Sequence, residues 1–518
     1  MRLTSLLLFQ LLILATSHAL GQTVRLTGTI KPSDGDSIEL NMPFDGNYWK
    51  KSSLYIHPDP SGNFHASLSF HAEKFILLLY KGKSHLLLLR PGRHLHISLV
   101  ADDSRQILHF SGNAKKENEW IQRLNLVEPG HLSFIKEIKE RGYDSYLRWS
   151  LDSVIRIKLP EIRHSLDSTE KCLHDAKLEP SLKNAIASEL KFYYAAAISQ
   201  YLGSWLYNGQ HPVNYEGFHS RFIDTVLSIF GLPTKEELDL GINANSYLET
   251  YFKFRLQKAF YLYRSDPDKE HADKVFHDMT GMSLHVLESE RDHNEKYIFS
   301  TRMNLILPRY AQERHLANLL VEFCMSDELM EADKLLQFIK VHCPESPYLG
   351  TCEKTFAPLR TLREQYADNL DIRIRPDYQR IHSLRDILAP YNGKVVFLDV
   401  WGTWCPHCLE DMAYEPGLKN RLKGQDIVYL YIAAEGDSND EGWRDFILIN
   451  DMTGEHIRQT MEQMGPLWNE LGIKDSEEAY PHYFIFDRSG SIVDRNAKRP
   501  SEADALFDQL KKVIASGR

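Results

Sequence analysis

Hydrophobic and polar residues alternate along three short stretches in the first part of the chain: residues 23–30, 64–70 and 94–99. A repeat of two residues places every second side chain on the same face of a β-strand. Turn-forming sequences separate the stretches, with DPSGN at residues 59–63 and Pro91-Gly92 before the third. The pattern predicts an N-terminal antiparallel β-sandwich over residues 22–112.

From residue 113 to residue 370 the apolar residues recur at three- and four-residue steps, which is the spacing of one face of an α-helix. The clearest examples are residues 182–206, 246–263 and 328–342. Prolines such as Pro233 and Pro308 separate such segments. This stretch predicts a central all-α region.

Strand and helix patterns alternate in the last part of the chain, residues 371–518. We expect, in order, strand 395–400, a helix from Cys408, strand 427–432, a helical insertion at about 455–471, strand 483–487, strand 491–494 and helix 502–515. This order is that of an α/β domain, so the chain is predicted to be multidomain.

The bulk properties fit a folded protein of several domains. The chain has 518 residues, of which 43% are hydrophobic and 25% charged. Its net charge of -10 argues against nucleic acid as a partner, because no basic field attracts phosphates.

The first 21 residues have the pattern of a cleavable signal peptide. Arg2 supplies the positive end, residues 6–15 are apolar, and small residues precede an expected cut before Gln22. The alternative is an uncleaved anchor, for which the apolar run is short. We therefore expect a mature protein without a membrane span in a bacterial periplasm, where disulfides persist.

Two cysteines, Cys405 and Cys408, are spaced Cys-x-x-Cys between the strand at 395–400 and the following helix. A helix N-terminus favours a thiolate, so we expect Cys405 to be the exposed, attacking sulfur and Cys408 to be buried and to resolve the mixed disulfide. A structural disulfide is one alternative. A zinc site is another, but it needs about four ligands, and no second cysteine pair lies nearby. We expect neither a metal nor a bound cofactor.

Residues 397–405 (FLDVWGTWC) and 479–490 (AYPHYFIFDRSG) together resemble the TlpA/ResA-like branch of extracytoplasmic thioredoxins. The N-terminal β region resembles β domains that precede such modules in periplasmic proteins. The resemblance implies a thioredoxin-like fold and a thiol–disulfide oxidoreductase that acts on protein thiols and disulfides with a redox partner protein. It also implies a cis bond before Pro481, which with Trp404 and Tyr480 would line the substrate groove. Relatives more often carry Thr where this chain has Tyr480.

Two acidic residues are candidates for proton transfer. Asp399 precedes Cys405 by six residues, where thioredoxin also has an acid; buried there, its carboxyl would have a raised pKa and could take the proton of Cys408. The alternative is a strand-end residue bonded to the backbone. Asp411 falls where ResA-like proteins place a Glu, but it is one methylene shorter; alternatively, it is a solvated residue of the first helical turn. Glu410 is a weaker candidate.

Pro406 and His407 are expected to tune the redox couple, because an imidazole close to Cys405 stabilises its thiolate. The Pro-His pair resembles that of the oxidising relative DsbA, whereas the surrounding motif resembles reducing proteins. The direction of electron flow stays open at this point.

Among the other cysteines, Cys343 and Cys352 are candidates for a structural disulfide; the alternative is two buried free thiols. A different function is also compatible with the sequence. The β and helical regions would bind a partner or ligand, and the thioredoxin fold would serve as a platform.

Overall fold

The computed structural model describes residues 22–32, 35–41, 53–101, 105–127, 153–208, 215–281, 283–286, 307–381, 383–474 and 478–516, with a few isolated positions between 132 and 140. The expected signal peptide lies outside these residues. The chain divides into two compact units, one of residues 1–319 and 338–350 and one of residues 320–337 and 351–518. The expected boundaries after residues 112 and 370 stay a prediction.

The first unit begins with two four-stranded sheets of strand order β4-β1-β7-β8 and β3-β2-β5-β6. Their strands are β1 (Gln22–Lys31), β2 (Ile38–Asn41), β3 (Ser53–Ile56), β4 (Asn63–Phe70), β5 (Lys74–Tyr80), β6 (Lys83–Leu89), β7 (His94–Ala101) and β8 (Gln106–Gly112). The expectation of purely antiparallel pairing is wrong for one pair, because β1 runs parallel to β7. These two strands are joined through the whole second sheet, and such a long connection permits parallel pairing, which a tight hairpin does not.

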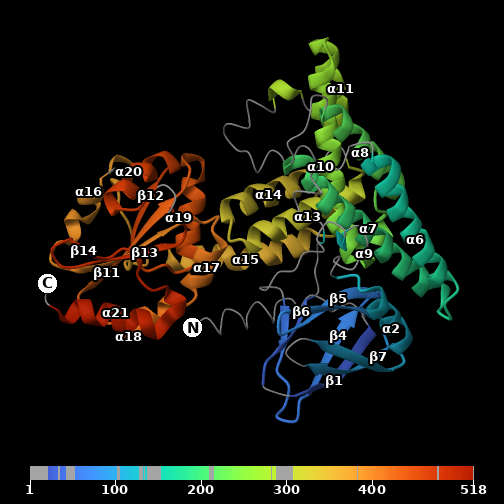
Figure 1. Ribbon diagram of the computed structural model, residues 1–518, viewed down its shortest axis with the longest axis horizontal. Coiled ribbons are helices and arrows are strands. Elements are labelled where there is room, and N and C mark those ends of the chain that lie inside the picture. The colour runs from blue at the N-terminus through green and yellow to red at the C-terminus, as the bar shows by residue number, and fades with distance from the viewer. Residues whose placement is uncertain are drawn as a thin grey trace. The chain divides into compact units, whose positions relative to one another are not determined.

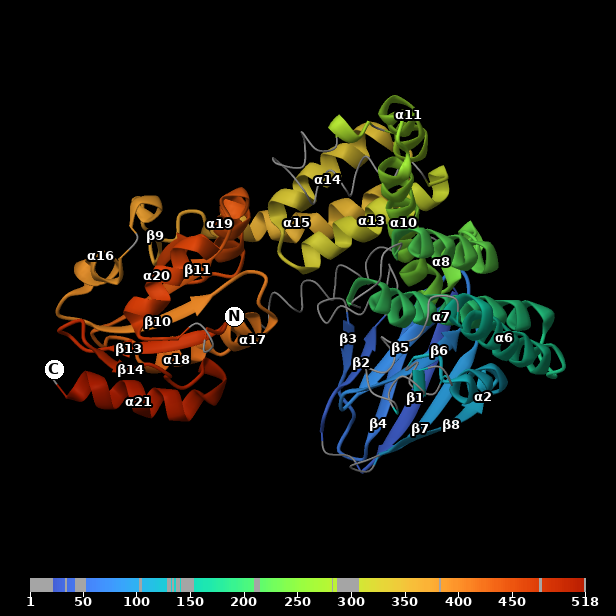
Figure 2. The same ribbon diagram turned by 45° about the horizontal axis from the view of Figure 1, so that its top comes forward.

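Both sheets contribute to one hydrophobic core. Leu26 and Ile97 come from the first sheet and Leu40 and Leu78 from the second, and all four are buried in the same cluster. Along β1 every second residue from Val24 is buried, as its alternating sequence predicts. The opposite face of β5 and β6 packs against helices, and Figure 2 shows α7 (Pro180–Asn208) beside these strands.

The rest of the first unit is largely helical, as expected. Its further helices are α2 (Lys115–Leu124), α6 (Leu159–His174), α8 (Tyr215–Phe230), α9 (Lys235–Leu240), α10 (Ile242–Ser265) and α11 (Lys269–Thr280). A π-helix (Val154–Lys158) precedes α6. Helices α13 (Arg309–Met325), α14 (Leu329–His342) and α15 (Leu349–Tyr366) follow, and the division between the two units passes through them.

Helix α2 is attached to strand β6 by the fully buried side chain of Asn118. Its amide oxygen accepts the backbone N–H of Leu88 at 2.9 Å, and its amide nitrogen donates to the carbonyls of Leu88 at 3.1 Å and Ala114 at 2.8 Å. The polar groups of the amide are thus satisfied by backbone on two elements.

The second unit is built around a six-stranded sheet of order β14-β13-β10-β11-β12-β9. The strands are β9 (Ile372–Ile374), β10 (Val395–Trp401), β11 (Ile427–Ala434), β12 (Gly454–Gln459), β13 (His482–Phe486) and β14 (Ile492–Asp494). All seven residues of β10 are buried, because this central strand is covered on both faces, and all of them except Asp399 are β-branched, aromatic or otherwise apolar. Strands β10, β11, β12 and β9 are parallel, and β13 and β14 are antiparallel to their neighbours.

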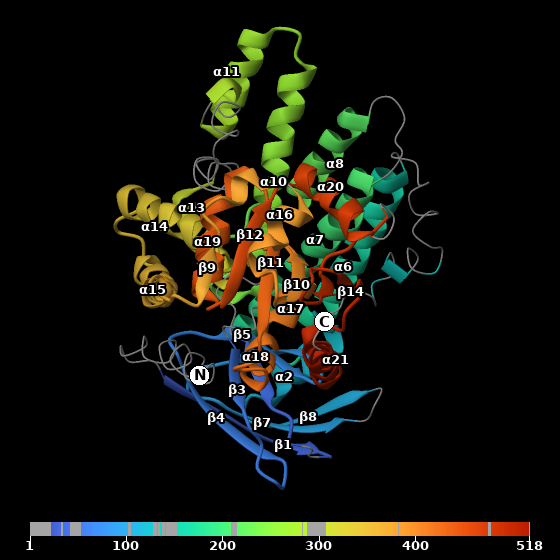
Figure 3. The ribbon, with the colours of Figure 1, turned by 90° about the vertical axis from the view of Figure 1, so that its left-hand side faces the viewer.

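Helices cover the two faces of this sheet in two layers. On one face, Phe397 of β10 packs with Leu418 of α18 (Glu415–Arg421) and Leu510 of α21 (Ala503–Ala515). On the other face, Leu398 packs with Trp443 of the helix described next. That layer consists of α16 (Leu384–Leu388), α19 (Asp440–Ile449) and α20 (Met461–Leu471), and Figures 1 and 3 show it opposite α18 and α21.

The predicted helical insertion at 455–471 is correct only in its second half. Residues 461–471 form α20, but residues 454–459 form β12. His456, Arg458 and Gln459 are buried in polar contacts on this strand, so its sequence carries no hydrophobic pattern. Helix α19 was not anticipated. Among the described helices, none combines the length and apolar character needed to cross a bilayer.

Replacing Asn118 tests the attachment of α2. In Asn118→Ala the N–H and carbonyl of Leu88 lose their buried partners, so we expect the free energy of unfolding to fall by about 2–3 kcal/mol. Urea unfolding measures this change. Lys116→Ala on the exposed face of the same helix is the control, and an equal effect of the two substitutions would contradict the role of Asn118.

Candidate active site

The Cys-x-x-Cys sequence lies where β10 ends and α17 (Pro406–Met412) begins. Cys405 is the N-cap residue of α17, and its sulfur accepts the backbone N–H of Cys408 at 3.2 Å. Pro406 occupies the first helical turn, where a missing N–H costs no hydrogen bond. The two cysteines form a disulfide. The contact from the Cys408 N–H is available to stabilise negative charge on the Cys405 sulfur once the disulfide is reduced.

Both cysteines are buried, which corrects the expectation that Cys405 is exposed. Its exposed fraction is 3%, and Cys408 is fully buried. In the oxidised state shown here, the disulfide holds the Cys405 sulfur against Cys408, which packs into the core of the domain. The expected contrast between an accessible and a buried sulfur is therefore absent from this state.

Next to the disulfide, Trp404 and Tyr480 form an aromatic surface. Trp404 is 52% exposed, its indole N–H donates to the Ala434 carbonyl at 2.9 Å, and its ring meets that of Tyr480 edge-on at 5.0 Å. Tyr480 also contacts Trp468 edge-on at 5.6 Å, and the peptide bond between Tyr480 and Pro481 is cis, as expected. This aromatic surface presents both apolar and polar groups beside the disulfide.

His407 points into solvent on the first turn of α17. Its Nδ1 lies 3.2 Å from Glu410 Oε2, and both side chains are largely exposed. The imidazole is thus paired with a carboxylate in the oxidised state. Tuning of the Cys405 thiolate by Pro406 and His407 stays a prediction.

The carboxyl group of Asp399 is buried inside the domain. It lies in the middle of the sheet, with Tyr431 of β11 and Tyr483 of β13 as its cross-strand neighbours, and its exposed fraction is 1%. Neither carboxyl oxygen has a partner among the described residues, so the alternative of a backbone-bonded residue is wrong. Burial, followed by the nearby charges of Glu415 and Asp411, raises the pKa of Asp399 well above its usual value.

The second candidate acid, Asp411, is buried and paired. Its Oδ2 accepts hydrogen bonds from Arg499 Nε at 2.7 Å and from the Tyr483 hydroxyl at 2.9 Å. The alternative of a solvated helix residue is therefore wrong. Arg499 thus pairs with Asp411, and the second donor to Asp411, Tyr483, is the strand neighbour of Asp399.

A third buried acid, Glu415, was missed by the sequence interpretation. It accepts the hydroxyl of Tyr431 and pairs with Lys419 Nζ at 3.1 Å, while its Oε1 has no partner among the described residues. An acid in the first turn of a helix ordinarily faces solvent, so its position gave no reason to expect burial. The i,i+4 spacing of Glu415 and Lys419 was the available indication.

Together, Asp399, Asp411 and Glu415 form a buried carboxylate cluster on one side of the central strand. Burial is also the largest cause that raises the pKa of Tyr431 and of Tyr483, so both phenols stay protonated as donors. Arg499 and Lys419 supply two balancing positive charges. This arrangement favours the protonated form of Asp399 inside the domain.

The pairing considered for Cys343 and Cys352 is absent, since both are buried free thiols. Burial raises the pKa of the Cys352 thiol to about 12, which makes it unreactive. Within the described ranges, no group of three or more His, Cys, Asp or Glu side chains is placed to hold a metal ion.

Comparisons with known proteins agree with this geometry. The Redoxin family matches residues 383–512. The thiol-disulfide oxidoreductase ResA of Bacillus thuringiensis subsp. konkukian is 28% identical over 128 residues, which span 24% of this chain and 67% of that protein. The C-terminal part of the chain is a ResA/TlpA-like domain.

Further similarities to this redoxin domain are of the same kind. ResA of Bacillus cereus strain ZK is 30% identical over 117 residues, spanning 21% of this chain and 57% of that protein. The solved thioredoxin domain of a thiol-disulfide oxidoreductase from Bacteroides vulgatus is 19% identical, covers 24% of this chain and 84% of that chain, and gives a TM-score of 0.21. These similarities all concern the part of the chain that the redoxin match covers, and they share its thiol-disulfide oxidoreductase character only as proteins to which this chain is similar.

Replacing Asp399 tests its unfavourable burial. Because the pKa is raised in the folded protein, the folded state loses stability relative to the unfolded state as the pH rises from the ordinary carboxyl pKa toward the raised one. Asp399→Asn removes this loss, which amounts to about 1.4 kcal/mol for each unit of raised pKa. Its stabilisation over wild type, measured by urea unfolding, should grow from about pH 4 to about pH 7.

The exposed carboxyl of Asp508 in the same domain provides the matched control, since Asp508→Asn should give no such pH-dependent difference. A constant difference for Asp399→Asn across this pH range, or a destabilisation that grows with pH, would show that the carboxyl is not held in its neutral form by the fold.

Proposed function

We propose that the protein is a periplasmic thiol–disulfide oxidoreductase that exchanges disulfides with protein substrates through its Cys-Pro-His-Cys site. The observation that carries the proposal is the disulfide at the N-terminus of α17, with the Cys408 N–H directed at the Cys405 sulfur. The match of residues 383–512 to the Redoxin family and their similarity to ResA support it. The proposed location rests on the signal-peptide pattern of residues 1–21.

In the reducing direction, the Cys405 thiolate attacks one sulfur of a substrate disulfide and forms a mixed disulfide, while the other substrate sulfur leaves as a thiolate and takes up a proton. Cys408 then gives its proton to the ionised form of Asp399 and attacks the Cys405 sulfur. The bond between Cys405 and the substrate breaks, and the second substrate sulfur leaves as a thiolate that takes up a proton. The products are the Cys405–Cys408 disulfide and two substrate thiols, so the dithiol supplies both electrons. Oxidation of a substrate is the same sequence in reverse.

The proposed substrate groove is lined by the aromatic side chains of Trp404 and Tyr480 and by Pro481. As the family resemblance implies, an extended substrate segment would pair with the backbone beside Pro481. Tyr480 is braced by Trp404 and Trp468, so its bulk is fixed in place. This favours substrates with an apolar or aromatic residue beside the reacting cysteine.

The direction of electron flow is set by the reduction potential of the couple. A potential of about -270 mV would make the protein a reductant, and one of about -120 mV an oxidant. Positive charge beside the Cys405 sulfur stabilises its thiolate and so favours the reduced form, whereas negative charge there destabilises the thiolate.

A trapping experiment tests the order of attack. In Cys408→Ser the mixed disulfide through Cys405 is not resolved, so we expect covalent complexes with periplasmic proteins that disappear on reduction. Non-reducing gels followed by mass spectrometry detect them. Cys172→Ser, which removes an exposed free cysteine, is the control and should trap nothing. Complexes that form equally well in Cys405→Ser would contradict the assignment of Cys405 as the nucleophile.

Insulin reduction tests the activity itself. We expect the reduced wild-type protein to reduce insulin and Cys405→Ala to lose the activity to background, because no second thiolate replaces it. Cys172→Ser should retain the wild-type rate. An inactive wild-type protein whose β and helical regions bind a ligand tightly would instead favour the platform function.

A further inference from the structure

Glu435 lies at the end of β11 and reaches the turn that carries the cysteines. It is 4% exposed, and its Oε1 accepts the backbone N–H of Thr403 at 2.5 Å. Its Oε2 accepts Asn439 Nδ2 at 3.0 Å, and the same amide nitrogen lies 3.4 Å from Thr403 Oγ1. A carboxylate therefore holds the backbone two residues before Cys405.

The backbone of Glu435 is fixed in turn. Its N–H donates to the Gln459 carbonyl at 2.9 Å, and its carbonyl accepts Arg458 Nη1 at 3.0 Å. Trp404 donates to the preceding carbonyl, that of Ala434. The turn between β10 and α17 is thus tied at two successive residues, Thr403 and Trp404, to the end of the neighbouring strand.

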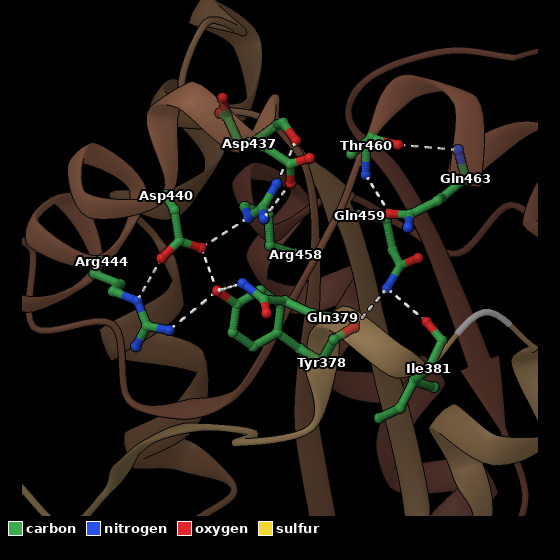
Figure 4. A network of polar contacts seen from close by, with 11 residues as sticks. Tyr378, Gln379, Ile381, Asp437, Asp440, Arg444, Arg458, Gln459, Thr460 and Gln463 are labelled. Atoms are coloured by element: carbon green, nitrogen blue, oxygen red, sulfur yellow. Dashed lines mark hydrogen bonds and ion pairs between the residues drawn. The ribbon is translucent and has the colours of Figure 1, made fainter. Parts of the chain in front are cut away.

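Arg458 is the centre of the network behind Glu435, shown in Figure 4. Its side chain is 3% exposed, and it bonds Asp437 Oδ1 at 2.7 Å and Asp440 Oδ1 at 2.9 Å. Arg444 pairs with the other oxygen of Asp440 at 2.9 Å. Burial alone would raise the pKa of Asp440, but the hydrogen bonds of Tyr378, Arg444 and Arg458 lower it below its usual value. The buried cation is therefore matched by ionised partners.

The segment before the redoxin domain joins the same network. Tyr378 lies in a short 3-10 helix (Tyr378–Arg380), and its hydroxyl donates to Asp440. The same hydroxyl oxygen accepts a hydrogen bond from Arg444 Nη2 at 3.1 Å. Gln459 donates to the carbonyls of Tyr378 at 3.3 Å and Ile381 at 2.8 Å. The family match begins at residue 383, so these contacts come from outside it.

We propose that Glu435 is a positioning residue for Cys405, and that the buried Arg458 network, including Tyr378 from the preceding segment, holds Glu435 in place. The inference rests on the proposed redox function and deepens it. Glu435 acts through the backbone and not by contact with a sulfur. It holds Thr403, and the turn that follows places the Cys405 sulfur next to the Cys408 N–H. A small displacement of a reacting atom is costly in rate, of the order of 100-fold for about 1 Å.

A pair of substitutions separates position from charge. Glu435→Gln keeps an oxygen that accepts the Thr403 N–H but removes the charge, whereas Glu435→Leu removes both. If Glu435 positions the turn, Glu435→Leu raises the pKa of the Cys405 thiol and slows insulin reduction about tenfold, while Glu435→Gln stays within about threefold of wild type. If its negative charge acts on the thiolate directly, both variants lower the pKa of Cys405 by the same amount.

The measurement is the pH dependence of Cys405 alkylation by iodoacetamide in the reduced full-length chain, read by mass spectrometry, together with insulin reduction. Glu441→Gln, which changes an exposed acid nearby, is the control and should match wild type. A wild-type pKa and rate in Glu435→Leu, or an equal lowering of the pKa in both variants, would overturn the proposal. An unreactive Cys405 in the wild-type protein would instead refute the proposed function.

Two milder variants keep the test decisive if Glu435→Leu does not fold. Asn439→Ala removes the second donor to Glu435. We expect the pKa of Cys405 to rise by less than about one unit, and an unchanged pKa would contradict the proposal. Tyr378→Phe removes a single hydroxyl outside the family match. A raised Cys405 pKa and a slower insulin reduction in Tyr378→Phe would show that the segment before the redoxin domain takes part. A wild-type pKa and rate would overturn the role proposed for that segment.

Discussion

The proposed redox chemistry depends on one contact, the hydrogen bond from the Cys408 backbone N–H to the Cys405 sulfur at the start of α17. A sulfur in this place gains from the N–H and from the helix terminus whenever it carries negative charge. The contact exists only because β10 delivers the chain to this point and the turn holds it there. The buried strand, the tie from Glu435 to Thr403 and the anchor of Trp404 all serve this geometry.

The buried carboxylate cluster of the same domain lowers its folding stability. Among the described residues, neither oxygen of Asp399 has a hydrogen-bond partner, and one oxygen of Glu415 has none. Removing a carboxyl from water without compensation is unfavourable, and such groups concentrate where protons are exchanged. Asp411 differs, because Arg499 and Tyr483 satisfy it. The cluster therefore combines Asp399, whose pKa is raised, with two acids that have basic and phenolic partners.

The sequence predicted those parts of the structure that carry a simple pattern. The apolar run of β10, the alternation in β1 and the Cys-x-x-Cys spacing each have a local cause, and the structure has them where expected. Buried polar groups escaped prediction, because their partners are distant in sequence. Arg458 and Gln459 sit on a strand that reads as helix, and Glu415 resembles a solvated helix start. The exposure of Cys405 was also misjudged, since the disulfide turns its sulfur inward.

The most direct test is the pH dependence with which Cys405 and Cys408 are alkylated in the reduced, folded wild-type chain. The account predicts that Cys405 titrates clearly below the ordinary thiol pKa of about 8.5 and that Cys408 is alkylated far more slowly. If Cys405 titrates at or above that value, or if the two thiols react alike, the Cys408 N–H does not stabilise a thiolate and the redox account is wrong.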